Sequence, residues 1–103
     1  MNLEQAKVAL ESLTTKSNPF NTLKAMIGAS GFCLVDKAVC FKFKMCRFSN
    51  YFRLELDEGH DLYNMVFMKI KRFDIVAVRR FDGIYADQLK EIFERETGLR
   101  LNL

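Results

Sequence analysis

The chain has 103 residues, of which 50% are hydrophobic, and it carries a net charge of +3. This length suits one domain with a core of its own, and the apolar share excludes a disordered chain. No apolar run approaches the roughly 20 residues that span a bilayer, and no leader with an apolar centre opens the sequence. We therefore expect a single α+β domain over 1–103, located in the cytoplasm of its host cell, without membrane association.

Two amphipathic helices are predicted at the start of the chain. The first covers Leu3 to Leu13, where apolar residues recur at helical spacing. The second begins at Asn18-Pro19, because Asn is a good cap and Pro suits the first helical position, and it ends near Gly28. Phe32 to Val35 then fits a short extra strand that turns at Asp36-Lys37.

A four-stranded antiparallel meander is predicted from Ala38 to Phe81. Apolar and polar residues alternate from Cys40 to Cys46 and again from Tyr51 to Asp57, which indicates two strands with one buried face each. Ser49-Asn50 suits the tight turn between them. That register places Lys44 opposite Glu55 and Lys42 opposite Asp57.

The second half of the meander leads into a final helix. The third strand is predicted over Leu62 to Ile70 and the fourth over Phe73 to Phe81, with Lys71-Arg72 as the turn and Lys69 opposite Asp74. A helix beginning near Asp82 and ending at Gly98 follows, packed with the first two on one face of the sheet. The alternating leucines from Leu99 to Leu103 are expected to lie against the body.

The closing pattern resembles that of a known group of proteins. Its parts are Tyr85-Ala86-Asp87-Gln88-Leu89, then Phe93, then Thr97-Gly98-Leu99 with Leu101 and Leu103, and Phe41 to Lys44 and Asp61-Leu62-Tyr63 are similar too. These residues resemble small uncharacterised proteins encoded by phages and prophages, over roughly the C-terminal two thirds of the chain. The resemblance implies a mobile-element origin and brings no activity, cofactor or catalytic residue with it.

The residue types of catalysis and metal binding form no recognisable pattern. His60 is the only histidine and falls in a predicted turn, and Cys33, Cys40 and Cys46 lack Cys-x-x-Cys spacing. Cys40 and Cys46 lie about 20 Å apart along one predicted strand, too far to bridge, so free thiols are expected. The acidic turn around His60 lacks the spacing of a calcium or zinc site. We predict no enzyme, no catalytic residue, no metal and no cofactor.

The third and fourth strands are apolar on both faces, which suggests a binding surface. Helices on one face of an antiparallel sheet bury only one set, so the other set forms an apolar patch. The patch is either covered within the chain, by the first helix or the tail, or by another chain. For the second case, the predicted partner-binding residues are Tyr63, Met65, Phe67, Val76 and Val78.

Positive charge is concentrated in the strand region. Residues 37–81 contain ten Lys/Arg and five Asp/Glu, while residues 82–97 contain two and five. This asymmetry suits a nucleic acid, or it lets the sheet and the final helix attract each other. The predicted nucleic-acid-binding residues are Arg47, Arg53, Lys71, Arg72, Arg79 and Arg80.

The sequence thus favours a small non-enzymatic protein-binding module, an adaptor or inhibitor. Its partner would be a host or phage protein, or a second copy of the chain in a homodimer. Nucleic-acid binding through the basic sheet region is the alternative.

Overall fold

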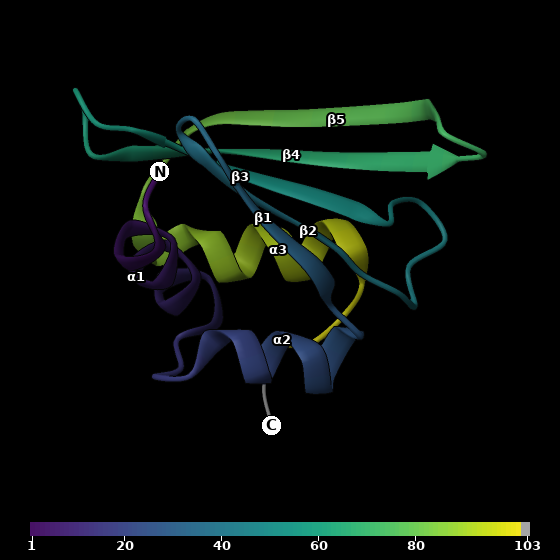
Figure 1. The fold of residues 1–103 in the computed structure, drawn as a ribbon, viewed down its shortest axis with the longest axis horizontal. Helices are drawn as coiled ribbons and strands as arrows, with labels where there is room; N and C mark the ends of the chain where they lie inside the picture. Colours follow the sequence, from purple (N-terminus) through teal and green to yellow (C-terminus); the bar gives the residue numbers. More distant parts are fainter. Residues whose placement is uncertain (102–103) are drawn as a thin grey trace.

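The computed structural model describes residues 1–101, which form two layers: helices on one side and an antiparallel sheet on the other (Figure 1). The predicted α+β class is confirmed. The sheet has five strands rather than four, because the short segment before Asp36-Lys37 does form an edge strand. In chain order the elements are α1 (Leu3–Thr14), α2 (Pro19–Ile27), β1 (Ser30–Val35), β2 (Ala38–Lys42), β3 (Tyr51–Asp57), β4 (Leu62–Lys71), β5 (Asp74–Ile84), a 3₁₀ turn (Ala86–Gln88) and α3 (Leu89–Thr97).

Local signals in the sequence set the helix ends. Asn2 Oδ1 accepts from the Gln5 amide at 2.8 Å, and Gln5 Oε1 accepts from the Asn2 amide at 3.1 Å, a reciprocal cap for α1. Pro19 opens α2 as predicted, and Gly28 ends it with a φ of 64°. A side chain at Gly28 would be strained, and its Cβ would approach the Lys44 side chain to 3.3 Å.

The β2–β3 connection is longer than predicted. It spans residues 43–50, where the Phe43 amide donates to the Asn50 carbonyl at 3.0 Å and the Lys44 amide donates to the Ile27 carbonyl at 2.9 Å. β2 ends at Lys42, and Met45 within the connection takes a φ of 73°. As a result Lys42 lies opposite Tyr51, and the predicted pairs of Lys42 with Asp57 and Lys44 with Glu55 are wrong.

The β4–β5 hairpin is also shifted from its predicted register. Its turn is formed by Arg72 and Phe73, both at positive φ, so Lys71 lies opposite Asp74 and Lys69 lies opposite Ala77. A bulge follows in β5. The predicted Lys69–Asp74 pair is therefore wrong.

The final helix begins later than predicted. β5 continues through Asp82 to Ile84, and α3 starts only at Leu89 after the 3₁₀ turn. Its predicted end is confirmed, because the Gly98 amide donates to the Glu94 carbonyl at 2.8 Å with Gly98 at a φ of 73°. Leu101 is fully buried, as expected for the tail, whereas Leu103 lies outside the described residues.

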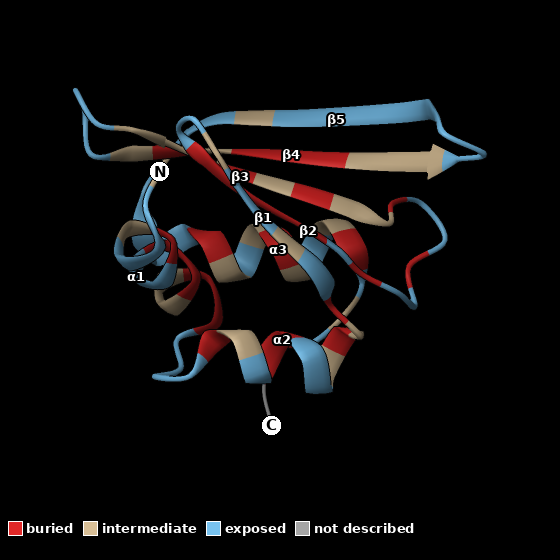
Figure 2. Ribbon diagram, viewed as in Figure 1, coloured by how far each residue is buried: buried red, intermediate tan, exposed pale blue. Residues whose placement is uncertain are grey.

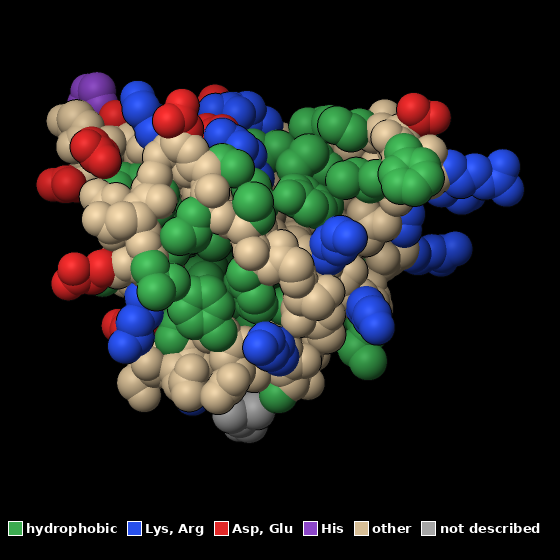
Figure 3. Space-filling view, in the orientation of Figure 1, with side chains coloured by type: hydrophobic (Ala, Val, Ile, Leu, Met, Phe, Trp, Pro, Cys, Tyr) green, Lys and Arg blue, Asp and Glu red, His purple; other side chains and the backbone are tan. Residues whose placement is uncertain are grey.

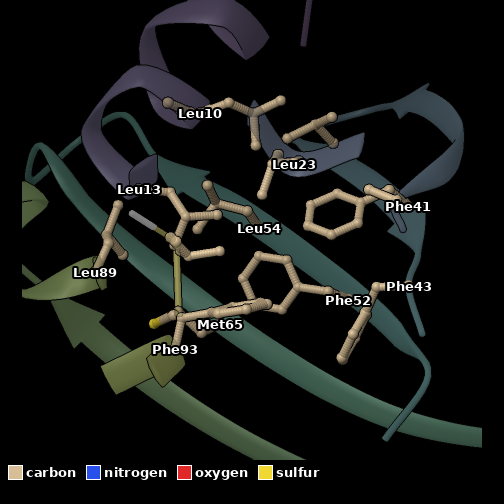
Figure 4. Close-up of a cluster of buried hydrophobic side chains, with 14 of the residues drawn as sticks. Leu10, Leu13, Leu23, Phe41, Phe43, Phe52, Leu54, Met65, Leu89 and Phe93 are labelled. Atoms are coloured by element: carbon tan, nitrogen blue, oxygen red, sulfur yellow. The ribbon is translucent and has the colours of Figure 1, made fainter. Parts of the chain in front are cut away.

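The core lies between the helices and the inner face of the sheet (Figure 4). Its centre is aromatic: the ring centroid of Phe52 lies 5.0 Å from that of Phe67 and 5.0 Å from that of Phe93. Phe41 and Phe43 extend the cluster toward α2 and the loop. Full burial of each such ring stabilises the fold by about 1.5–3 kcal/mol, so Phe93 docks α3 onto the sheet.

Candidate functional site

The register separates the two faces of the sheet. Phe41, Phe52 and Phe67 lie side by side on β2, β3 and β4, and all three belong to the core beneath the helices. Residues next to them in each strand must face the other way. The adjacent row therefore faces outward, and it consists of Lys42, Tyr51, Met68 and Val78.

This assignment corrects the predicted partner-binding set. Tyr63, Met65 and Phe67 are buried on the inner face against the helices. Phe67 lies opposite Arg79, and Val76 falls at the bulge. Val76 and Val78 are exposed, and binding through these two remains a prediction.

An apolar surface does exist, but on the outer face. We call it the outer apolar strip. It crosses β3, β4 and β5 on the half of the sheet nearest the Arg72–Phe73 turn, and it comprises Tyr51, Met68, Ile70, Ile75 and Val78. No described helix covers this face, and β5 is almost entirely exposed along its length (Figures 1 and 2). β5 is also an edge strand, with a β-strand neighbour on one side only. Sequence reasoning missed the strip's β4 members because both faces of that strand are apolar.

The other half of the outer face holds a charged cluster centred on Glu55. Its Oε1 accepts from Arg80 Nη2 at 2.8 Å and from Asn64 Nδ2 at 3.4 Å, and its Oε2 accepts from Arg53 Nε at 2.8 Å. Burial acts to raise the pKa of the Glu55 carboxyl, but these hydrogen bonds outweigh it and hold the pKa below its usual value. Arg80 also donates to Asp82 Oδ1 at 2.7 Å.

The predicted nucleic-acid-binding residues divide into two groups. Arg53 and Arg80 are engaged by Glu55, and Arg79 Nη1 lies 3.2 Å from Glu96 Oε1, which ties the sheet to α3. These three arginines therefore have ion-pair partners within the fold. The remaining ones, Arg47, Lys71 and Arg72, form no ion pair among the described residues.

A pocket of about 350 Å³ opens beside the outer apolar strip. Lys42, Lys44 and Tyr51 line it together with Asn50 and Ile70. Burial raises the pKa of the Tyr51 hydroxyl, and the neighbouring Cys40 thiol adds to the rise. Burial likewise raises the pKa of Cys40, so both groups are neutral at pH 7. The pocket therefore combines two cations with a neutral aromatic side chain.

Chemistry-bearing residues elsewhere are dispersed. His60 Nδ1 lies 3.1 Å from Asp57 Oδ2 in the exposed β3–β4 turn. Within residues 1–101, no three His, Cys, Asp or Glu side chains are grouped so as to hold a metal ion. None of the helices described is long and apolar enough to cross a membrane.

The chain matches no family model, no curated protein and no solved structure.

Proposed function

We propose that the protein is a small non-enzymatic protein-binding module that engages its partner through the outer apolar strip and the adjoining edge of β5. One observation carries this proposal: no described helix covers the strip, and its members Ile75 and Val78 are more than half exposed, although monomers seldom leave a contiguous apolar surface open. The resemblance to phage and prophage proteins suggests an adaptor or inhibitor directed at a host or phage protein complex.

Neither the first helix nor the described part of the tail covers the outer apolar strip. The first helix contributes Ala6, Leu10 and Leu13 to the core on the inner face of the sheet. Leu101, at the described end of the tail, is buried in that same core. Both candidates for internal coverage therefore lie on the opposite face, which favours a second chain.

The area available suggests moderate affinity. Ile75 and Val78 are each slightly more than half exposed, so covering them contributes about 1 kcal/mol apiece. Association costs about 4–15 kcal/mol, and the strip alone does not offset that. Backbone hydrogen bonds to the open edge of β5 supply the remainder, as in partners that add a strand to a sheet. The β5 bulge limits such pairing to part of the strand.

Sedimentation velocity across a range of concentrations tests the proposal for a second copy of the chain. We expect Val78→Glu to abolish dimer formation. The matched control is Val8→Glu on α1, because Val8 is 54% exposed and Val78 is 56% exposed. Circular dichroism should show both variants folded, since neither valine is in the core.

A different protein partner is tested by capture from the native host with the same pair of variants. The captured protein should be lost with Val78→Glu and retained with Val8→Glu. A wild-type monomer that captures nothing dependent on Val78 would refute the proposal.

A further inference from the structure

One end of the sheet gathers segments that are distant in the sequence. Lys42 at the end of β2, Tyr51 at the start of β3 and Met68 near the end of β4 lie side by side. The 43–50 loop and the Arg72–Phe73 turn therefore both leave from this end. Asn50 joins them, because its Nδ2 donates to the Ile70 carbonyl and its Oδ1 accepts from the Ile70 amide, each at 2.8 Å.

Positive charge outweighs negative charge at this end, where Asp74 lies opposite Lys71. No Asp or Glu occurs between Ala38 and Leu54 or between Leu62 and Phe73. Lysine and arginine side chains gather at the tip of the β4–β5 hairpin (Figure 3). We define the basic end by its cations that enter no ion pair in the described part of the chain: Lys42, Lys44, Arg47, Lys69, Lys71 and Arg72.

Aromatic rings are exposed among these cations. Phe48 is 72% exposed, and Phe73, at 103%, is the most exposed of the large hydrophobic residues described. Arg47 lies over the Phe48 ring, 5.9 Å from its centroid. Phe73 follows Lys71 and Arg72 directly, at the outermost point of the hairpin.

The residues of the Arg72–Phe73 turn are not those that its backbone conformation favours. A two-residue hairpin with both central residues at positive φ favours Asn-Gly, yet here Arg72 has a φ of 52° and Phe73 a φ of 71°. A bulky residue at positive φ is strained, and such strain clusters at binding sites. A fully exposed ring contributes no packing that offsets the strain. Contact with a ligand would supply that packing.

Exposed aromatics among cations suit either a single-stranded nucleic acid or an anionic membrane surface. The pocket lined by Tyr51 favours a single-stranded nucleic acid over a membrane surface. Its volume of about 350 Å³ accommodates a nucleotide, with Tyr51 to contact a base and Lys42 and Lys44 to meet a phosphate. The Lys44 side chain lies beside Gly28.

We propose that the basic end binds single-stranded nucleic acid, with Phe73 and Phe48 stacking on bases and the six cations following the phosphates. Unstacked bases expose the π-faces that such rings contact, whereas duplex bases do not. The site shares Tyr51 with the outer apolar strip, but it does not depend on the protein-binding proposal, because neither Phe73 nor the six cations belong to the strip.

Fluorescence anisotropy with labelled oligonucleotides tests the proposal. The probes are oligo-dT and oligo-U of about 12 nucleotides, which fall within the site sizes of comparable surfaces, and a duplex of equal length. We expect both single strands to bind more tightly than the duplex. The difference between oligo-dT and oligo-U decides whether DNA or RNA is preferred. Affinity should fall steeply between about 50 and 200 mM salt.

Phe73→Gly provides a variant that cannot lose binding through unfolding. Gly removes the ring and relieves the positive φ, so the melting temperature should be unchanged or higher. Affinity for the single strands should nevertheless fall about 5- to 100-fold, the loss of one stacked base. The salt dependence should stay the same, because no charge is removed.

Lys71→Gln should reduce the salt slope by about 0.7, the value for one phosphate contact on a single strand. Its matched control is Lys16→Gln, an exposed lysine between α1 and α2, which should change nothing. Failure to bind either single strand at low salt would overturn the proposal, as would equal affinity for the duplex with no effect of Phe73→Gly. Binding only to vesicles containing phosphatidylglycerol would assign the basic end to membranes and also overturn it.

Discussion

Replacement of Glu55 by Gln tests the charged cluster on the outer face. The Glu55 side chain is 17% exposed and accepts two hydrogen bonds of 2.8 Å from guanidinium groups. A hydrogen bond to a charged group contributes about 1.5–3 kcal/mol, and Gln leaves Arg53 without its counter-charge, while Arg80 keeps Asp82. We expect a loss of about 2 kcal/mol, which lowers the melting temperature by roughly 10 °C. Glu58→Gln, in the exposed β3–β4 turn, is the control and should stay within about 0.5 kcal/mol of the wild type.

The stability difference between the wild type and Glu55→Gln should depend on pH. The folded-state pKa of Glu55 is lowered, so its contribution is fully present above the unfolded pKa of about 4.3 and is lost as pH falls through the folded value. Urea unfolding followed by circular dichroism should therefore show a gap between wild type and Glu55→Gln that is largest at neutral pH. The gap should shrink below about pH 4. Equal stability at pH 7, or a gap unchanged in acid, would refute the reasoning.

Two further predictions concern the core and the thiols. Phe93→Ala removes the ring that contacts Phe52 and Phe67 and should cost about 3–5 kcal/mol, measured by urea unfolding, while Phe48→Ala in the exposed loop should cost little. A thiol reagent should modify one cysteine rapidly in the native protein, since Cys33 is exposed while Cys40 and Cys46 are buried, and all three in denaturant; three rapid equivalents in the native state would contradict the fold.

Features encoded by a few adjacent residues could be predicted from the sequence. Pro19 and Gly28 bracket α2, and Gly98 ends α3, because each residue has a backbone preference that acts locally. The alternation in β3 likewise identified the buried face of that strand, with Phe52 and Leu54 in the core.

Register was not predictable in the same way. The period-two pattern of β2 continues through Phe43 to Cys46, although the strand ends at Lys42 and Met45 takes a positive φ in the connection that follows. No Gly or Pro marks that break. The orientation of β4 is ambiguous for a different reason, since Val66 and Met68 are as apolar as Met65 and Phe67. Only the position of the helices decides which pair faces the core beneath them.

The candidate sites depend on these non-local choices. The bond between Arg80 and Glu55 joins residues 25 apart in the chain and requires β3, β4 and β5 to be neighbours in the observed register. With that register known, Arg53, Arg79 and Arg80 are stabilising residues. The other predicted nucleic-acid-binding residues, Arg47, Lys71 and Arg72, lie at the basic end of the sheet.

The distribution of backbone strain separates the two ends of the sheet. Of the five non-glycine residues at positive φ in the described chain, Thr15 terminates a helix and Asp61 belongs to a residue type that tolerates this conformation. The other three, Met45, Arg72 and Phe73, all lie at the basic end and are all exposed. Folding stability alone would favour Gly or Asn at such positions. The local choices agree with the fold elsewhere and conflict with it at one charged and aromatic end, which is the end that we propose binds nucleic acid.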